Sequence, residues 1–175
     1  DDITEKLMIG DGTDAKEWDT TTDSYGDKYL SLEAGKYYLE SNLTLTDAPI
    51  VIEGTNVTLC LNGKTISCGN NTNLDCVIMV NCSWANNKVQ NVGQLTLGDC
   101  GGSEKTAGTI SGGKNAAVKV YGGSTLNMHG GTITGSKSYG VELNGSKGGT
   151  TTFNMYGGVI GGAVAAPDAT GNKNS

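Results

Sequence analysis

The sequence predicts an all-β protein, a right-handed parallel β-helix (β-solenoid) of about four to five coils. Three observations support this prediction. Glycine accounts for 28 of the 175 residues, more than twice its usual share of about 7%. Apolar and polar residues alternate in short runs, and similar segments recur along the chain. Glycine between short alternating runs indicates many tight corners that join short strands.

The clearest recurrence aligns without gaps. Residues 125–135 (TLNMHGGTITG) match residues 152–162 (TFNMYGGVIGG), and residues 59–67 (LCLNGKTIS) have the same layout. A second series of alternating runs, including those at Val118 and Val141, follows these units. Each repeat therefore holds three short strands. Such strands are too short to form a stable hairpin sheet alone, but they pair with their counterparts when coils stack.

Alternation assigns the inward side chains to columns that run along the solenoid axis. The expected columns are Leu59, Leu95, Leu126 and Phe153; Leu61, Leu97, Met128 and Met155; and Ile66, Ile110, Ile133 and Ile160. On the outer face, Lys119 and Glu142 fall on neighbouring positions. An ion pair between them would contribute at most a few tenths of a kcal/mol.

The chain divides into three segments. Residues 1–36 are acidic and lack the repeat, so we expect an N-terminal flank or cap, because a bare end exposes core and strand edges. Residues 37–162 are expected to form the β-helix, beginning with an incomplete coil. Residues 163–175 are polar and supply no obvious strand. We expect them to be a flexible tail, or the point from which a longer natural polypeptide continues.

Composition narrows the possible partners. The net charge is −6 and every basic residue is Lys, so no basic face is available to neutralise phosphates and nucleic acid is not expected as a partner. No apolar run approaches the roughly 18 residues that cross a bilayer, so membrane insertion is not expected. The five cysteines leave at least one thiol unpaired and lack zinc-site spacing. The cysteines can all be packing residues, or two of them can form a single disulfide, and both alternatives remain open.

Residues that carry hydrolytic chemistry are sparse. Between residues 57 and 162 the carboxylates are Asp75, Asp99, Glu104 and Glu142, and no two align in neighbouring coils, whereas glycosidases use a carboxylate pair. No phosphate-loop or nucleophile motif is present. We therefore expect a protein that is not an enzyme, with no catalytic residue, cofactor or metal site. The acidic flank has the oxygen ligands that calcium prefers, but not EF-hand spacing.

The outer face offers one candidate ligand-binding site. Asn62, His129 and Tyr156 are expected beside the same corner, and Asn127 and Asn154 on the strands that lead to it. An aromatic platform with a few polar groups suits a sugar. A linear glycan would lie along the side of the solenoid and cross several coils.

A flat ice-binding surface requires a regular array of threonines. Thr96, Thr109, Thr132 and Thr134 are expected to be too scattered to form one.

With these motifs identified, the chain resembles the parallel β-helix repeat regions of large, adhesin-like surface proteins of anaerobic Gram-positive bacteria. The resemblance rests on residues 35–39 (GKYYL) leading to residues 56–66 (NVTLCLNGKTI), and on the repeat at residues 153–160 (FNMYGGVI). The architecture is similar to that of the pectate-lyase-like superfamily. The resemblance implies a secreted, often wall-anchored part of a larger multidomain chain, located outside the cell at its surface or in its wall.

The expected function is a non-catalytic extracellular surface module, an adhesin or stalk, with a glycan or a host- or cell-surface protein as candidate partner. The alternative is a carbohydrate-binding module of a polysaccharide-degrading enzyme. Pectate-lyase-like enzymes typically combine an Arg or Lys base with calcium-binding carboxylates, and this chain has no Arg.

Overall fold

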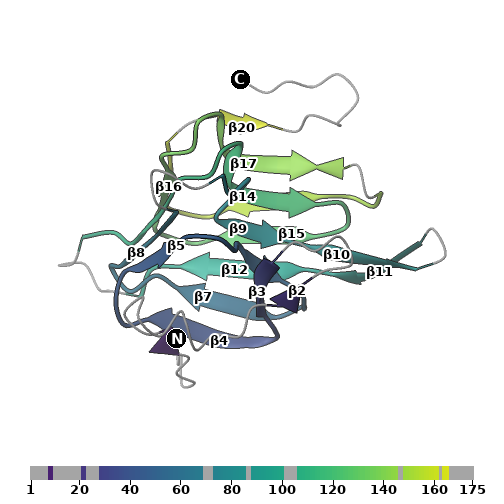
Figure 1. Cartoon of the computed structure of the whole chain (residues 1–175), viewed down its shortest axis with the longest axis horizontal. Coiled ribbons are helices and arrows are strands. Elements are labelled where there is room, and N and C mark those ends of the chain that lie inside the picture. Colours follow the sequence, from purple (N-terminus) through teal and green to yellow (C-terminus); the bar gives the residue numbers. More distant parts are fainter. Residues whose placement is uncertain are drawn as a thin grey trace.

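The structure is a computed structural model that describes residues 8–9, 21–22, 28–68, 73–85, 88–100, 106–145, 148–161 and 163–165. Every regular element in these residues is a β-strand, which confirms the all-β prediction. The strands form three large sheets and one two-stranded sheet. In the large sheets all pairs are parallel except β2–β3, and the strands stack from the N-terminal to the C-terminal end of the molecule (Figure 1). Within the described part of the chain, no helix has the length and apolar character needed to cross a membrane.

The first sheet has six strands in the order β1-β4-β7-β12-β15-β18. Their bounds are β1 Met8–Ile9, β4 Gly35–Leu39, β7 Val57–Cys60, β12 Gln94–Gly98, β15 Thr125–Met128 and β18 Thr152–Met155. Each strand therefore pairs with one from a neighbouring repeat and not with the strand next to it in sequence.

The other two large sheets have the same character. The five-stranded sheet has the order β19-β16-β13-β8-β5 and the seven-stranded sheet the order β2-β3-β6-β9-β14-β17-β20. The five-stranded bounds are β5 Leu43–Leu45, β8 Thr65–Cys68, β13 Thr109–Ser111, β16 Thr132–Thr134 and β19 Val159–Ile160. The seven-stranded bounds are β2 Thr21–Thr22, β3 Lys28–Leu32, β6 Ile50–Ile52, β9 Ile78–Val80, β14 Ala116–Tyr121, β17 Tyr139–Asn144 and β20 Ala163–Ala165.

The chain visits the three sheets in turn, for example β12, β13 and β14, then β15, β16 and β17. Each circuit thus adds one strand to each sheet, as in a solenoid. The inward side chains of neighbouring circuits pack into a single apolar core. In the five-stranded sheet, Ile110 lies opposite Ile66 and Ile133, and Ile133 opposite Ile160. This confirms the predicted isoleucine column.

The predicted register of the six-stranded sheet was wrong by two residues between its earlier strands. Leu97 lies opposite Leu59, and Leu95 opposite Val57. A two-residue shift preserves alternation, so the pattern alone could not exclude it. Leu61 continues past the strand as a fully buried corner residue. It packs under Gly131, where φ is +87° and an added Cβ would lie 2.7 Å from Leu61 Cδ1.

Both expected flanks contribute strands. β3 lies within residues 1–36 and pairs parallel to β6, with Leu30 opposite Ile50. β20 lies within residues 163–175 and pairs with β17. Its Ala-Val-Ala run carries a weak strand signal because alanine is depleted in strands. The rest of the expected tail, residues 166–175, lies outside the described residues.

One corner is enlarged into a hairpin. β10 (Cys82–Ala85) pairs antiparallel with β11 (Lys88–Val92), and the pair extends sideways from the stack (Figure 1).

A disulfide links neighbouring circuits. Cys60 at the end of β7 is bonded to Cys100, just beyond β12, with the Cα atoms 5.7 Å apart. Cys68 and Cys76 are free, and the side chain of Cys82 lies outside the described residues. Of the two alternatives that the cysteine count left open, the structure contains one disulfide.

Candidate functional site

Four of the five predicted ligand-binding residues lie together on the outer face of the six-stranded sheet. Asn127 lies opposite Asn154, and the Asn154 amide Nδ2 donates a hydrogen bond of 2.9 Å to Asn127 Oδ1. One residue beyond Met128 and Met155, the rings of His129 and Tyr156 stack with their centroids 4.6 Å apart and an interplanar angle of 18°. We call these four residues the ladder patch.

Asn62 does not belong to the ladder patch. It takes a positive φ of 50°, which Asn tolerates better than most residues, and its Nδ2 donates to the Leu39 carbonyl oxygen at 2.9 Å. The two-residue register shift accounts for its position. Cys60, not Asn62, lies opposite Gly98, and the His129 amide bonds to the adjacent Leu97 carbonyl.

Part of the ladder patch's binding capacity is used within the patch itself. Stacking occupies one face of each ring, although Tyr156 remains 67% exposed. The side-chain amides of Asn127 and Asn154 likewise use part of their hydrogen-bonding capacity on each other. The arrangement is that of a self-satisfied side-chain ladder, which stabilises stacked strands.

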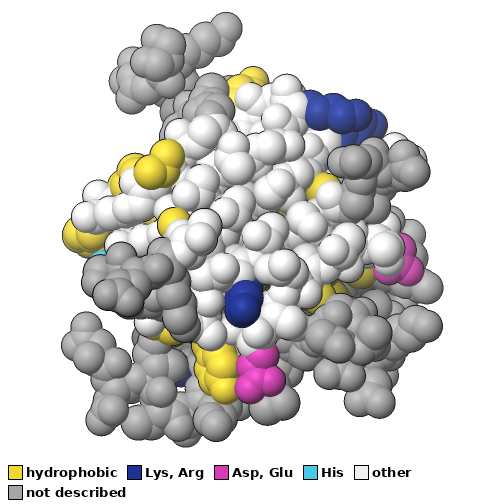
Figure 2. Space-filling model, turned by 90° about the vertical axis from the view of Figure 1, so that its left-hand side faces the viewer, with side chains coloured by type: hydrophobic (Ala, Val, Ile, Leu, Met, Phe, Trp, Pro, Cys, Tyr) yellow, Lys and Arg dark blue, Asp and Glu magenta, His cyan; other side chains and the backbone are white. Residues whose placement is uncertain are grey.

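The outer face of the five-stranded sheet carries two columns of hydroxyl side chains. Thr109 lies opposite both Thr65 and Thr132, and Ser111 lies opposite both Ser67 and Thr134. The expectation that these threonines are scattered was therefore wrong for Thr109, Thr132 and Thr134, although the predicted isoleucine column already implied this register. Figure 2 looks onto this side of the molecule, where few charged side chains are visible on the described surface.

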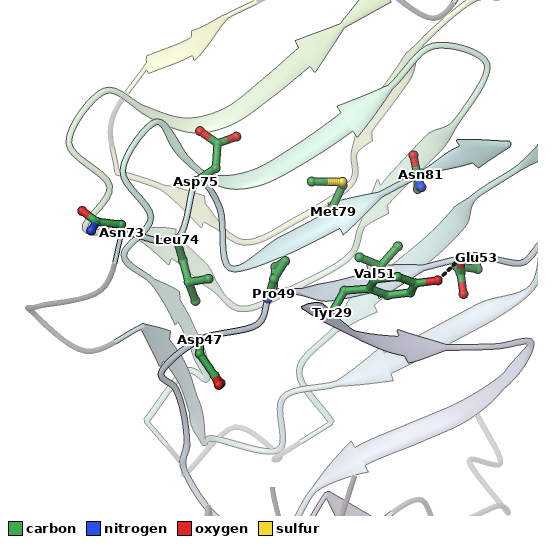
Figure 3. Close-up of a pocket in the computed structure, with 10 residues that line it drawn as sticks. All are labelled: Tyr29, Asp47, Pro49, Val51, Glu53, Asn73, Leu74, Asp75, Met79 and Asn81. Carbon is green, nitrogen blue, oxygen red and sulfur yellow. Dashed lines mark hydrogen bonds between the residues drawn. The ribbon is translucent and has the colours of Figure 1, made fainter. Parts of the chain in front are cut away.

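A pocket with a cavity volume of about 460 Å³ lies on the outer face of the seven-stranded sheet. We call it the outer pocket. Its described lining residues are Tyr29, Asp47, Pro49, Val51, Glu53, Asn73, Leu74, Asp75, Met79 and Asn81. Val51 and Met79 are register neighbours in β6 and β9, so the pocket crosses successive circuits. In Figure 3, Tyr29 lies along Val51 toward Glu53, and Asn73, Leu74 and Asp75 form the opposite end.

The outer pocket combines an apolar floor with acceptor groups. The Tyr29 hydroxyl donates to Glu53 Oε1 at 3.2 Å, and the Ser31 hydroxyl donates to Glu53 Oε2. These bonds orient the carboxylate at one end of the pocket. Asp47 and Asp75 add two further carboxylates, and none of the ten described lining residues is basic. The pocket is therefore electronegative, with amide groups from two asparagines beside the carboxylates.

Beyond the pocket, on the same outer face, Lys119, Asp75 and Glu142 form what we call the charge cluster. Lys119 lies opposite Met79 on one side and Glu142 on the other. Its Nζ contacts Asp75 Oδ2 and lies 3.4 Å from Glu142 Oε2, which confirms the predicted Lys119–Glu142 pairing. The expected contribution of a few tenths of a kcal/mol applies to a surface ion pair, whereas Lys119 and Glu142 are only 7% and 6% exposed.

The ion pairs decide the charge state of Lys119. Burial alone would lower the pKa of Lys119, but the hydrogen bond to Asp75 and the charges of Asp75 and Glu142 outweigh it and raise the pKa. The resting side chain is therefore an ammonium. Next to Asp75, the thiol of Cys76 is fully buried, and burial raises its pKa to about 12. Cys76 is accordingly a protonated thiol near neutral pH.

Sequence reasoning missed the outer pocket, and in the charge cluster it missed Asp75. Asp75 precedes β9 in a corner, so it has no counterpart in the strand alignment, yet it converges with Glu142 on Lys119. Tyr29 belongs to the expected flank. The available signal was the alternation of β6, β9, β14 and β17, which places Val51, Met79, Lys119 and Glu142 in one outward column.

The described residues contain no group of three or more His, Cys, Asp or Glu side chains that could hold a metal ion. The fold and the pocket define an all-β protein of three parallel sheets with a ligand-sized hollow on one outer face. Comparisons with protein-family models, curated proteins and solved structures find no match.

Proposed function

We propose that the chain is a right-handed parallel β-helix of about four to five coils with an N-terminal cap. We further propose that it is a non-catalytic extracellular surface module, an adhesin or stalk. Its proposed ligand is a neutral oligosaccharide. Right-handedness is supported by the strong chiral preference of parallel crossover connections. The surface location is supported by the resemblance in the repeat motifs, which also favours a larger multidomain chain.

The outer pocket is the observation that carries the binding proposal. Its volume of about 460 Å³ lies within the range of small-ligand sites, and it combines apolar surface with a few placed polar groups. Val51 and Met79 supply an apolar floor, and the ring of Tyr29 lies beside it. The carboxylate of Glu53 accepts hydrogen bonds from hydroxyl groups of the protein. Sugar hydroxyls would be bound by the same charge-assisted interaction.

The charge of the pocket favours a neutral ligand over an acidic one. Asp47 and Glu53 line the same hollow, and none of its described lining residues is basic, whereas the third carboxylate, Asp75, is already paired with Lys119. A uronic acid would place a like charge beside these carboxylates, which is unfavourable.

Calorimetric titration with neutral and uronic-acid oligosaccharides of matched length tests this proposal. We expect binding of a neutral ligand, weakened about 10-fold or more by Glu53→Gln, since a hydrogen bond to a charged group is worth about 1.5–3 kcal/mol. Tyr29→Ala should weaken binding as well. Tyr156→Ala, in the ladder patch, is the matched control and should bind like the parent. Loss of binding in Tyr156→Ala with normal binding in Glu53→Gln would move the site to the ladder patch.

Two other outcomes would change the functional class. A folded parent that binds no oligosaccharide but retains a cell-surface protein would support the adhesin without the glycan. Turnover of any polysaccharide by the isolated chain would refute a non-catalytic module.

The alternative function, a carbohydrate-binding module of a polysaccharide-degrading enzyme, uses the same pocket. The full-length gene separates them, because an adjoining catalytic domain favours the enzyme module and a wall-sorting signal favours the adhesin.

A further inference from the structure

The charge cluster contains the parts of an amide-forming site. An ammonium, a carboxylate in contact with it and a second buried carboxylate meet at one point: Lys119 Nζ touches Asp75 Oδ2, and Glu142 Oε2 lies 3.4 Å from the same nitrogen. The side chains of Lys119 and Glu142 are 8% and 9% exposed. We propose that Lys119 and Asp75 condense into an intramolecular isopeptide bond, with Glu142 as the proton-transfer group. This proposal does not rest on the ligand of the outer pocket, although Asp75 also lines that pocket.

Proximity lowers the barrier to the reaction. Lys119 lies in β14, and Asp75 precedes β9, the neighbouring strand of the same sheet, so the folded stack holds the two reacting groups together. Groups held in this way react as if at effective concentrations of about 10⁵–10⁸ M, provided that their geometry is suitable. The competing nucleophile, the thiol of Cys76, is held as the less reactive protonated form by burial.

Asp75 is better placed than Glu142 to be the electrophile. Its other carboxyl oxygen, Oδ1, accepts a hydrogen bond from the Asn115 side-chain amide, which would stabilise negative charge that develops on that oxygen during attack. The Asp75 side chain is also 42% exposed and lines the outer pocket. A departing water molecule therefore has a route to solvent on that side.

The reaction balances without a co-reactant. Glu142 takes one proton from the Lys119 ammonium, and the Nζ lone pair attacks Cγ of Asp75 to form a carbon–nitrogen bond. The bond between Cγ and Oδ2 then breaks. Oδ2 leaves as water with two protons, both originally on Nζ, one of them delivered through Glu142. The amide keeps the third proton, the positive and negative charges cancel, and no electrons are transferred.

Intact-mass measurement of the reduced full chain tests the proposal directly. We expect the principal species to be lighter than the sequence mass by one water molecule. After proteolysis, fragmentation should show the peptide containing Asp75 joined to the peptide containing Lys119. A parent protein of unaltered mass, even after prolonged incubation in the folded state, would show that the cluster is an ion pair only. A loss of water without the joined peptides, as from a cyclic imide, would equally overturn the proposal.

Variants separate the roles within the cluster. Lys119→Arg and Asp75→Ala should retain the full sequence mass, since each removes a reacting group. Most of the Glu142→Gln protein should keep the full sequence mass over the time in which the parent loses one water molecule. Lys114→Arg, at an exposed lysine just before β14, is the matched control for Lys119→Arg and should form the bond like the parent. A Glu142→Gln protein with a native circular dichroism spectrum and normal bond formation would remove Glu142 from the mechanism.

Discussion

The imidazole ring of His129 lies flat against the phenol ring of Tyr156, at 4.6 Å between centroids. The two residues follow Met128 and Met155, which are register partners in β15 and β18. The stacked pair therefore joins two circuits on their outer face, at the same position where the sheet backbone joins them through hydrogen bonds.

We expect this stacking to contribute a measurable coupling energy. Aromatic pairs are worth about 0.5–1.5 kcal/mol beyond burial of area, and the exposure of Tyr156 places this pair near the lower end. In a double-mutant cycle of His129→Ala and Tyr156→Ala, measured by urea unfolding, the double variant should lose less stability than the sum of the two single variants. Strict additivity of the two single substitutions would contradict a stabilising stack.

The isoleucine column should dominate the energetics of the five-stranded sheet. Ile133 is fully buried between Ile110 and Ile160. Ile133→Ala is expected to lower the free energy of unfolding by about 2–5 kcal/mol, through lost burial and a residual cavity. Ile160→Ala, at a position that is only partly buried, is the matched control and should cost less. Equal effects in denaturant titrations would contradict the inferred burial gradient.

The disulfide should stabilise the stack through the unfolded state. Cys60 and Cys100 are separated by 40 residues, and a loop of that size corresponds to about 4 kcal/mol in the chain-entropy model. A Cys60→Ser, Cys100→Ser double variant should therefore unfold at a lower urea concentration than the oxidised parent. Reduction of the parent should have a similar effect. An unchanged midpoint after verified reduction would show that the bond contributes little.

The buried thiol of Cys76 predicts a loss of stability at alkaline pH. Its pKa in the folded protein is raised from 9.0 to about 12, so the folded state retains a proton that the unfolded state loses in this range. The contribution to stability is complete below about pH 9 and falls by about 1.4 kcal/mol per pH unit as pH approaches 12. Unfolding titrations between about pH 8 and 11 should show a steeper decline for the parent than for Cys76→Ala. Parallel profiles would contradict the predicted titration.

Alternation was sufficient to predict the stacked architecture. Ile66, Ile110 and Ile133 each occupy the centre of a polar-Ile-polar run, and their side chains share one buried column. Register was harder to predict. Moving Leu59 from opposite Leu95 to opposite Leu97 keeps every apolar side chain inward, so the choice depends on how the following corner packs.

The candidate site was less predictable because some of its residues lie outside the repeat pattern. Asp75 occupies a corner, and Tyr29 comes from the segment before the first recognisable repeat. Periodicity predicts residues that recur, such as Val51 and Met79 on the pocket floor, whereas Asp75 and Tyr29 each occur once. The ladder patch was partly predictable because His129 and Tyr156 do recur at equivalent positions.

The hairpin formed by β10 and β11 leaves and rejoins the stack at one point. The Gly93 amide donates to the Asn81 carbonyl, and the Ser124 hydroxyl of the next circuit donates to the same carbonyl and accepts from the same amide. These hydrogen bonds hold the two ends of the insertion, Asn81 and Gly93, together, so residues 82–92 form a loop whose ends are fixed in the stack. Extra sequence can be gained or lost at this junction without displacing the strands above and below it. The junction is therefore a natural graft point, where a foreign loop could be displayed on an unchanged scaffold.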